Sequence, residues 1–267
     1  MERPLWAPQG IDITRPSVAR MCDYYLGGSH NFEVDRAAAR KALEIWPELP
    51  MIMRANRAFM RRAVRYAVSL GITQFLDIGS GIPTFGNVHE VARATDPRCR
   101  IVYVDNDPVA VAHSEAIVGD DPGIGVIGAD ARRPREILDS PVLHKVLDLD
   151  RPVALLMVAL LHFIEDKDEP ERIIAELRDA LPPGSCFAIT HASTEGGRIR
   201  EPDESKDPYK RMGNPLVMRG RAEILRFFDG FELVEPGLVH MTDWRPDPGG
   251  EDDPAKSIGF AGFGLKR

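Results

Sequence analysis

From residue 73 onward, short hydrophobic runs alternate along the chain with stretches of helical periodicity. The runs predict five buried strands, at Gln74–Ile78, Arg100–Val104, Gly125–Ala129, Val153–Val158 and Ser185–Thr190. Helices are expected between the strands, near Asn87–Thr95, Val109–Val118, Pro134–Val146 and Pro170–Leu181. Strands that alternate with helices indicate βαβ units and a parallel sheet, and continuous hydrophobic strands indicate a sheet covered on both faces. The pattern therefore predicts an α/β fold.

The two flanks of this alternating region have different patterns. The first 70 residues predict three helices: one capped by Ser17 that ends at Gly27-Gly28, one at Val34–Trp46 and one at Pro50–Leu70. The C-terminal part predicts a helix at Arg219–Phe228 and a final strand pair at Phe231–Val234 and Ile258–Leu265. The polar segment Ala192–Pro215 is long enough to be a functional loop.

Composition and charge narrow the function classes. The 267 residues are 43% hydrophobic and 28% charged, as in ordinary globular proteins, and the net charge of -7 argues against a nucleic-acid binder. The basic run from Arg54 to Arg65 is interpreted as a solvated helix face. Three widely spaced cysteines without a C-x-x-C pair suggest neither a metal site nor a disulfide framework. No apolar stretch approaches the length of a membrane span, so a cytoplasmic protein is expected.

Candidate binding residues follow the predicted strands, where ligands bind in open parallel sheets. A turn with Gly79, Ser80 and Gly81 follows the first strand, Asp105 and Asn106 follow the second, and Asp130 and Ala131 follow the third. The glycines suit close approach of a ligand to the backbone, Asp105 suits the two hydroxyls of a ribose, and Asp130 with the Ala131 amide suits an adenine. The alternative for each aspartate is a helix cap or a turn, which Asp107 before Pro108 fits best.

The first turn distinguishes between adenosine ligands. A dinucleotide fingerprint requires a third glycine, but Thr84 stands at that position. Asp77, two residues before Gly79, would repel a pyrophosphate and would suit the ammonium and sulfonium of S-adenosylmethionine (SAM). The sequence therefore favours SAM over NAD, and a buried structural carboxylate remains the alternative for Asp77.

At this point the chain resembles the class I SAM-dependent methyltransferases. Residues 75–81 resemble their first motif, residues 102–105 their second, and residues 128–131 their adenine-binding segment. The flanks, with residues 15–28 and 235–238 among them, resemble a bacterial S-adenosyl methyltransferase family that was long described as a domain of unknown function. The resemblance implies a Rossmann-like seven-stranded sheet of order 3-2-1-4-5-7-6, mostly parallel, with its last strand antiparallel.

The resemblance also implies how the chain is divided and where the N-terminal part contributes to the site. An N-terminal helical cap would occupy residues 1–72, over a SAM-binding core at residues 73–267 that forms one compact domain with it. Within the cap, Tyr24 and Asn31 are expected at the cofactor, together with Tyr25 and Phe32. Core packing is the alternative for the tyrosine pair.

The expected reaction is transfer of a methyl group from SAM to an unidentified, small-molecule acceptor. Alignment of the acceptor can supply most of the rate, and a general base is needed only if the acceptor must lose a proton. His162 and His191, at the ends of the fourth and fifth strands, are the candidate bases, with Glu165 nearby. Two alternatives stay open: a SAM-binding protein without catalytic activity, and an NAD-dependent oxidoreductase.

Overall fold

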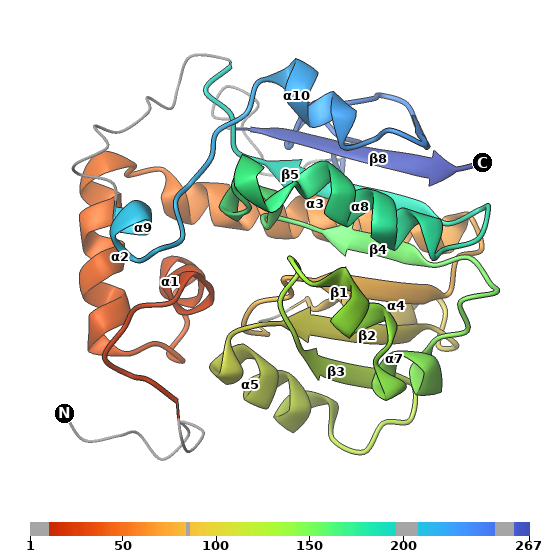
Figure 1. The fold of residues 1–267 in the computed structure, drawn as a ribbon, viewed down its shortest axis with the longest axis horizontal. Coiled ribbons are helices and arrows are strands. Elements are labelled where there is room, and N and C mark those ends of the chain that lie inside the picture. Colours follow the sequence, from red (N-terminus) through yellow and green to blue (C-terminus); the bar gives the residue numbers. More distant parts are fainter. Residues whose placement is uncertain (1–10, 84–85, 196–207, 249–258) are drawn as a thin grey trace.

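The computed structural model describes residues 11–83, 86–195, 208–248 and 259–267. A central sheet has the strand order β3-β2-β1-β4-β5-β8-β6, and a short strand β7 also pairs with β8 (Figure 1). The neighbouring pairs among β1 to β5 are parallel, and β8 is antiparallel to β5, β6 and β7. This confirms the predicted fold class, with one more strand than expected.

The strands lie close to the predicted hydrophobic runs. Their bounds are β1 Gln74–Ile78, β2 Arg100–Asp105, β3 Ile124–Gly128, β4 Ala154–Met157, β5 Cys186–His191, β6 Phe231–Leu233, β7 Val239–His240 and β8 Phe260–Lys266. Strand β7 was not predicted, because two residues carry no periodicity. Part of the predicted last strand and part of the predicted Ala192–Pro215 loop lie outside the described residues.

The connecting helices are α4 Val88–Thr95, α5 Pro108–Val118, α6 Pro134–Leu138, α7 Pro141–Val146, α8 Pro170–Asp179, α9 Pro208–Arg211 and α10 Arg221–Arg226. The single helix predicted over Pro134–Val146 is wrong. Pro141, which lacks a backbone N–H, starts a new helix, and Ser140 accepts a hydrogen bond from the Val142 amide at its N-terminus. Two short 3-10 turns, Leu161–Phe163 and Asp166–Asp168, follow β4.

Three N-terminal helices precede the sheet: α1 Val18–Tyr25, α2 Glu33–Ile45 and α3 Leu49–Ser69. Figure 1 shows α1 and α2 beyond the ends to which the parallel strands point, with α9 beside them. Ser17 precedes α1 as predicted, but its hydroxyl does not cap the helix. Its backbone amide instead donates to Asp35 Oδ1 at 2.9 Å, which ties the start of α1 to α2.

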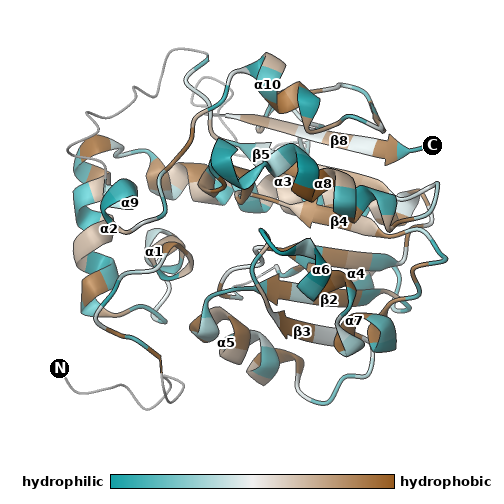
Figure 2. Ribbon diagram, in the orientation of Figure 1, coloured by the Kyte–Doolittle hydropathy of each residue, from teal (hydrophilic) through white to brown (hydrophobic). Residues whose placement is uncertain are grey.

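Both faces of the sheet are buried. Phe75 packs in a hydrophobic cluster with residues of α3 and α4, whereas its neighbour Leu76 packs in a second cluster with residues of α7, α8 and α10. Figure 2 shows hydrophobic residues along the strands and hydrophilic residues on the outer helix surfaces. None of the helices in the described part of the chain is long and apolar enough to cross a membrane. The sheet therefore forms a rigid base for the loops at the carboxyl ends of its strands.

Candidate functional site

A cavity of about 350 Å³ lies at the carboxyl ends of the parallel strands. Its walls come from α1, from the N-terminal half of α3 and from the segments that follow β1, β2, β3 and β4. Eight of the ten residues predicted to bind the cofactor line it: Asp77, Gly79, Ser80, Gly81, Asp105, Asn106, Asp130 and Ala131. The strand ends are thus brought together as predicted.

The turn after β1 depends on its glycines. Gly79 and Gly81 have φ angles of +74° and +67°, in the left-handed region that favours glycine. A Cβ atom on Gly79 would also lie 2.8 Å from a Leu160 methyl group. The turn thereby brings its backbone to the cavity wall, where Ser80 Oγ is buried without a hydrogen-bond partner among the described residues.

Asp105 ends β2 and is held by backbone amides. Its Oδ2 accepts from the Gly81 N–H and its Oδ1 from the Asp107 N–H, both at 2.8 Å. Burial raises the pKa of Asp105 to about 6, against the effect of these two hydrogen bonds. Asp107 caps α5 through the Val109 amide at 2.7 Å, as the alternative for this residue predicted. Asp105 is therefore a fixed acceptor at the cavity wall.

Asp77 is a buried carboxylate at the cavity, 8% exposed. No hydrogen bond to its side chain occurs among the described residues, and burial raises its pKa to about 7. The guanidinium of Arg57 on α3 counteracts this rise, and the charge of Asp105 adds to it. A buried acidic group without a hydrogen-bond partner is costly in the ligand-free protein and suits a cationic ligand.

Asp130 and Ala131 form the wall beyond β3. Asp130 Oδ2 pairs with Arg132 Nη2 at 2.6 Å, and its Oδ1 accepts from the Arg132 amide at 2.9 Å. Burial acts to raise the pKa of Asp130, but the hydrogen bonds from Arg132 outweigh it and hold the pKa below its ordinary value. Asp130 is therefore ionised and in a fixed orientation.

The other two predicted cofactor residues, Tyr24 and Asn31, do not line the cavity. Tyr24 packs against the hydrophobic cluster on the α3 side, as the packing alternative predicted. Asn31 Nδ2 donates at 2.7 Å to Asp23 Oδ2, and Asp23 does line the cavity. A Cβ atom on Gly28 would lie 2.0 Å from Asp23 Oδ1, which explains the second glycine after α1.

Tyr25 and Phe32 also take part in packing. Tyr25 is buried, and its hydroxyl lies 3.1 Å from that of Tyr209 on α9. Phe32 is buried in a small cluster with Ile82, Val109 and Ala110, beside the turn after β1. Neither ring lines the cavity, so both side chains have a packing role next to it.

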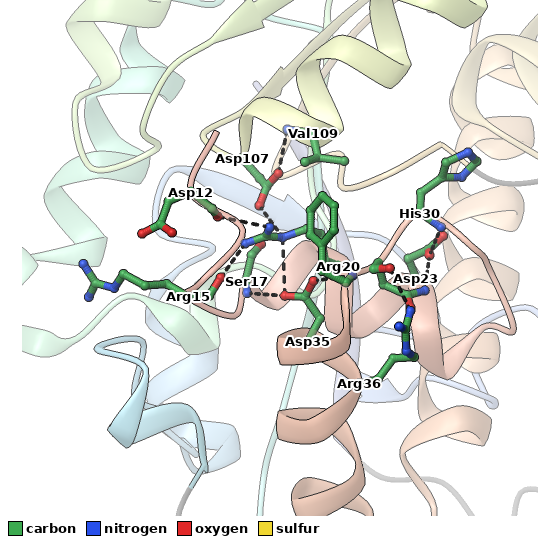
Figure 3. Close-up of polar contacts among 12 residues, drawn as sticks. Asp12, Arg15, Ser17, Arg20, Asp23, His30, Asp35, Arg36, Asp107 and Val109 are labelled. Carbon is green, nitrogen blue, oxygen red and sulfur yellow. Dashed lines mark hydrogen bonds and ion pairs between the residues drawn. The ribbon is translucent and has the colours of Figure 1, made fainter. Parts of the chain in front are cut away.

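A buried arginine joins the N-terminal helices to the sheet (Figure 3). The Arg20 side chain on α1 is 6% exposed, and its Nε lies 3.4 Å from Asp35 Oδ1 on α2 and 3.4 Å from Asp107 Oδ2. Its Nη2 donates to the Arg15 carbonyl oxygen at 2.8 Å. Because Asp107 lies two residues after Asp105, this cluster fixes α1 against the turn that follows β2.

The two predicted base candidates, His162 and His191, are buried beside the cavity but do not line it. His191 Nδ1 lies 2.7 Å from the Ala192 carbonyl oxygen, and its Nε2 lies 3.1 Å from Arg219 Nη1. These partners imply a neutral ring that donates from Nδ1 and accepts at Nε2. Burial lowers the pKa of His191 to about 4 and that of His162 well below its ordinary value.

Comparison with known proteins identifies the family. A family model described as S-adenosyl methyltransferase matches residues 4–267. The chain belongs to this family. It is a SAM-dependent methyltransferase, and SAM is its cofactor. Membership disfavours the NAD-dependent oxidoreductase.

Solved structures agree with this assignment. A protein from Thermobifida fusca YX is 39% identical over 99% of this chain and 100% of its own, with a TM-score of 0.87. A DUF574 family protein from Streptomyces avermitilis is 37% identical over 96% of this chain and 99% of its own, with a TM-score of 0.88.

More distant similarity concerns the fold alone. The N-methyltransferase NodS from Bradyrhizobium japonicum, in complex with S-adenosyl-L-homocysteine (SAH), is 13% identical over 94% of this chain and 99% of its own, with a TM-score of 0.50. No curated protein is significantly similar to this chain.

Three charged residues of the cavity wall, Asp23, Arg57 and Arg132, were not predicted from the sequence. Arg57 belongs to the basic run interpreted as a solvated helix face, yet it is half-buried and lines the cavity. Arg62 in the same run is 4% exposed, and its guanidinium donates to the carbonyl oxygens of Trp244 and Met241 at 2.9 and 2.7 Å. The interpretation as a solvated face is wrong for these two arginines.

Proposed function

We propose that the cavity binds SAM with its adenosine along the ends of β1, β2 and β3. Asp105 accepts hydrogen bonds from the ribose hydroxyls, Asp130 and the Ala131 amide bind the adenine, and Asp77 binds the ammonium of the methionine moiety. One observation supports this proposal above the others. The carboxylates at the carboxyl ends of three neighbouring strands line a single cavity, together with the glycine turn after β1.

The residues present fit this ligand. Asp77 and Ser80 Oγ are buried beside the cavity without hydrogen-bond partners among the described residues, so both can bind a polar ligand without losing an existing bond. The carboxylates suit a cation, as the sulfonium and ammonium of SAM require. When bound, SAM supplies an electrophilic methyl group on a sulfonium that leaves as a neutral thioether.

The acceptor is proposed to be a small molecule bound between the N-terminal helices and the segment after β4. Met53 and Met60 from α3, Phe163 after β4 and Asn214 line this part of the cavity wall. The two methionines and Phe163 exclude water, and the wall holds the acceptor in line with the methyl group, which is the main requirement of the reaction. A cavity of this size fits a small molecule better than duplex nucleic acid.

We further propose that His162 and His191 have a structural role rather than that of a general base. Both ring nitrogens of His191 already have partners, and neither ring lines the cavity. The acceptor atom would then be nucleophilic without the help of a histidine, as in an amine, a thiolate or a carboxylate. This replaces the role that the sequence suggested for the two residues.

Calorimetric titration of the purified protein with SAM, SAH and NADH tests the cofactor assignment. Binding of SAM and SAH without binding of NADH is expected, and binding of NADH alone would falsify it. To find the acceptor, the protein is incubated with methyl-labelled SAM and fractions of a small-molecule extract, with Asp105→Ala, at a SAM concentration below its dissociation constant, as the control. Transfer of label to one compound only with the wild-type protein identifies the acceptor, whereas SAM binding without transfer to any small-molecule fraction contradicts a small-molecule acceptor.

A further inference from the structure

Two opposite charges line the cavity without pairing with each other. Asp77 at the end of β1 and Arg57 on α3 both contribute to the cavity wall. Each is the strongest opposite charge acting on the other, yet no ion pair joins them among the described residues. Arg57 Nη2 donates instead to the Ile82 carbonyl oxygen at 3.2 Å, in the turn after β1. The hydrogen bond found for the guanidinium is thus to the turn and not to the carboxylate.

We propose that Arg57 binds the carboxylate of the methionine moiety, so that the α-amino acid end of SAM lies between Arg57 and Asp77. This inference rests on the proposed SAM site and assigns a specificity residue within it. The two charged groups of an α-amino acid stand on one carbon atom and require opposite charges that face them from two sides. Arg57 and Asp77 both line the cavity without an ion pair between them, so the ammonium can contact Asp77 while the carboxylate contacts Arg57.

The cost of unpaired charges also favours this arrangement, since Asp77 is buried and Arg57 is half-buried. Buried charges are costly unless they are paired and hydrogen-bonded. A zwitterion placed between the two side chains compensates both at once, whereas a neutral ligand compensates neither. Guanidinium groups bind carboxylates in a bidentate manner, and Ser80 Oγ offers a further hydroxyl beside the same turn. The site should therefore select nucleosides that carry an amino acid over those that do not.

The test compares SAH with its decarboxylated analogue, which keeps the ammonium but lacks the carboxylate. Calorimetry on the wild-type protein should show a preference for SAH of about 10- to 100-fold, as expected for hydrogen bonds to a charged group. Arg57→Gln should remove this preference by weakening SAH alone, and Arg57→Lys should restore part of it. Arg54→Gln, at an exposed position of the same helix, is the matched control and should keep the full preference.

Each outcome decides the proposal. A preference below about threefold in the wild-type protein overturns the role of the carboxylate before any variant is made. A full preference that persists in Arg57→Gln assigns the carboxylate to another residue and overturns the role of Arg57, although the SAM site stands. If the wild-type protein binds neither ligand, the proposed function itself fails, and this inference fails with it. A circular dichroism melt of Arg57→Gln and Arg57→Lys shows that the comparison is made on folded protein.

Discussion

The affinity for SAH should fall steeply as the pH is lowered from about 7.5 to about 5.5. The structure raises the pKa of Asp77 to about 7, mainly by burial, and that of Asp105 to about 6, also mainly by burial. In the proposed complex both groups are ionised, because Asp77 faces an ammonium and Asp105 accepts from hydroxyl groups. Protonation of either carboxylate in the ligand-free protein therefore competes with binding.

The magnitude follows from the ionised fraction of each group. For Asp77, this fraction falls about 25-fold over the two pH units, and for Asp105 it falls about fourfold. If only the doubly ionised form binds, the affinity falls by the product, about 100-fold. Near pH 6.5 the two groups together should release about one proton per SAH bound.

Isothermal titration calorimetry measures both quantities when the titrations are repeated in buffers with different ionisation enthalpies. Asp77→Asn is the matched variant and should bind SAH more weakly than the wild-type protein at pH 7.5. Its affinity for SAH should fall only about fourfold further between pH 7.5 and pH 5.5, because Asp105 alone then titrates. An affinity of the wild-type protein that changes less than about threefold, with no proton release, would show that the two carboxylates do not contact the ligand.

Four further results are expected. Asp105→Ala should weaken SAH by roughly 1.5–3 kcal/mol in the same titrations, and an unchanged affinity refutes the ribose assignment. Arg20→Met should lower the free energy of unfolding in urea by about 3–5 kcal/mol, because it leaves Asp35 and Asp107 buried without their cation; a loss below about 1 kcal/mol contradicts this account of the cluster. His191→Gln should lower the free energy of unfolding by about 1–3 kcal/mol and keep the SAH affinity, so a variant that loses affinity while keeping its stability argues for a role at the site. The raised pKa values of Asp77 and Asp105 make the folded, ligand-free protein hold protons that the unfolded chain releases, so its stability should fall as the pH rises towards about 7. The increase in Tm caused by saturating SAH should therefore be larger at pH 7.5 than at pH 5.5. An equal increase in Tm at both pH values contradicts this linkage.

Sequence patterns predicted the core of the fold well, for a physical reason. The strands β1 to β5 are hydrophobic on both faces, so their position along the chain appears in the sequence without knowledge of the partners. The residues at their ends, such as Asp77 and Asp105, then share one edge because parallel strands end on the same side. The order of the strands came from the family resemblance, since hydrophobic periodicity says nothing about which strands are neighbours.

The starts and ends of helices were harder to predict. Pro134 and Pro141 both start helices, and only the second divides the segment that was read as one helix. The pair Gly27-Gly28 was predicted to end the first helix, for which one glycine would suffice. Its reason became visible only with the fold, because Gly28 makes room for the carboxylate of Asp23, which Asn31 holds from the other side.

Helix α3 shows most clearly why some residues of the cavity wall could not be predicted from the sequence. Arg54, Arg57 and Arg61 follow one another at helical spacing, and the pattern alone assigns them the same environment. In the structure the N-terminal half of α3 contributes to the cavity wall, while residues of its C-terminal half pack against the sheet. Arg57 therefore faces a ligand cavity, and Arg54, one turn earlier, faces solvent. The difference depends on where the helix passes the end of the sheet, which is a property of tertiary packing and not of the helix. Motifs at strand ends predict the proposed nucleoside contacts, whereas the residue proposed to bind the amino acid end comes from a helix whose position only the folded chain defines.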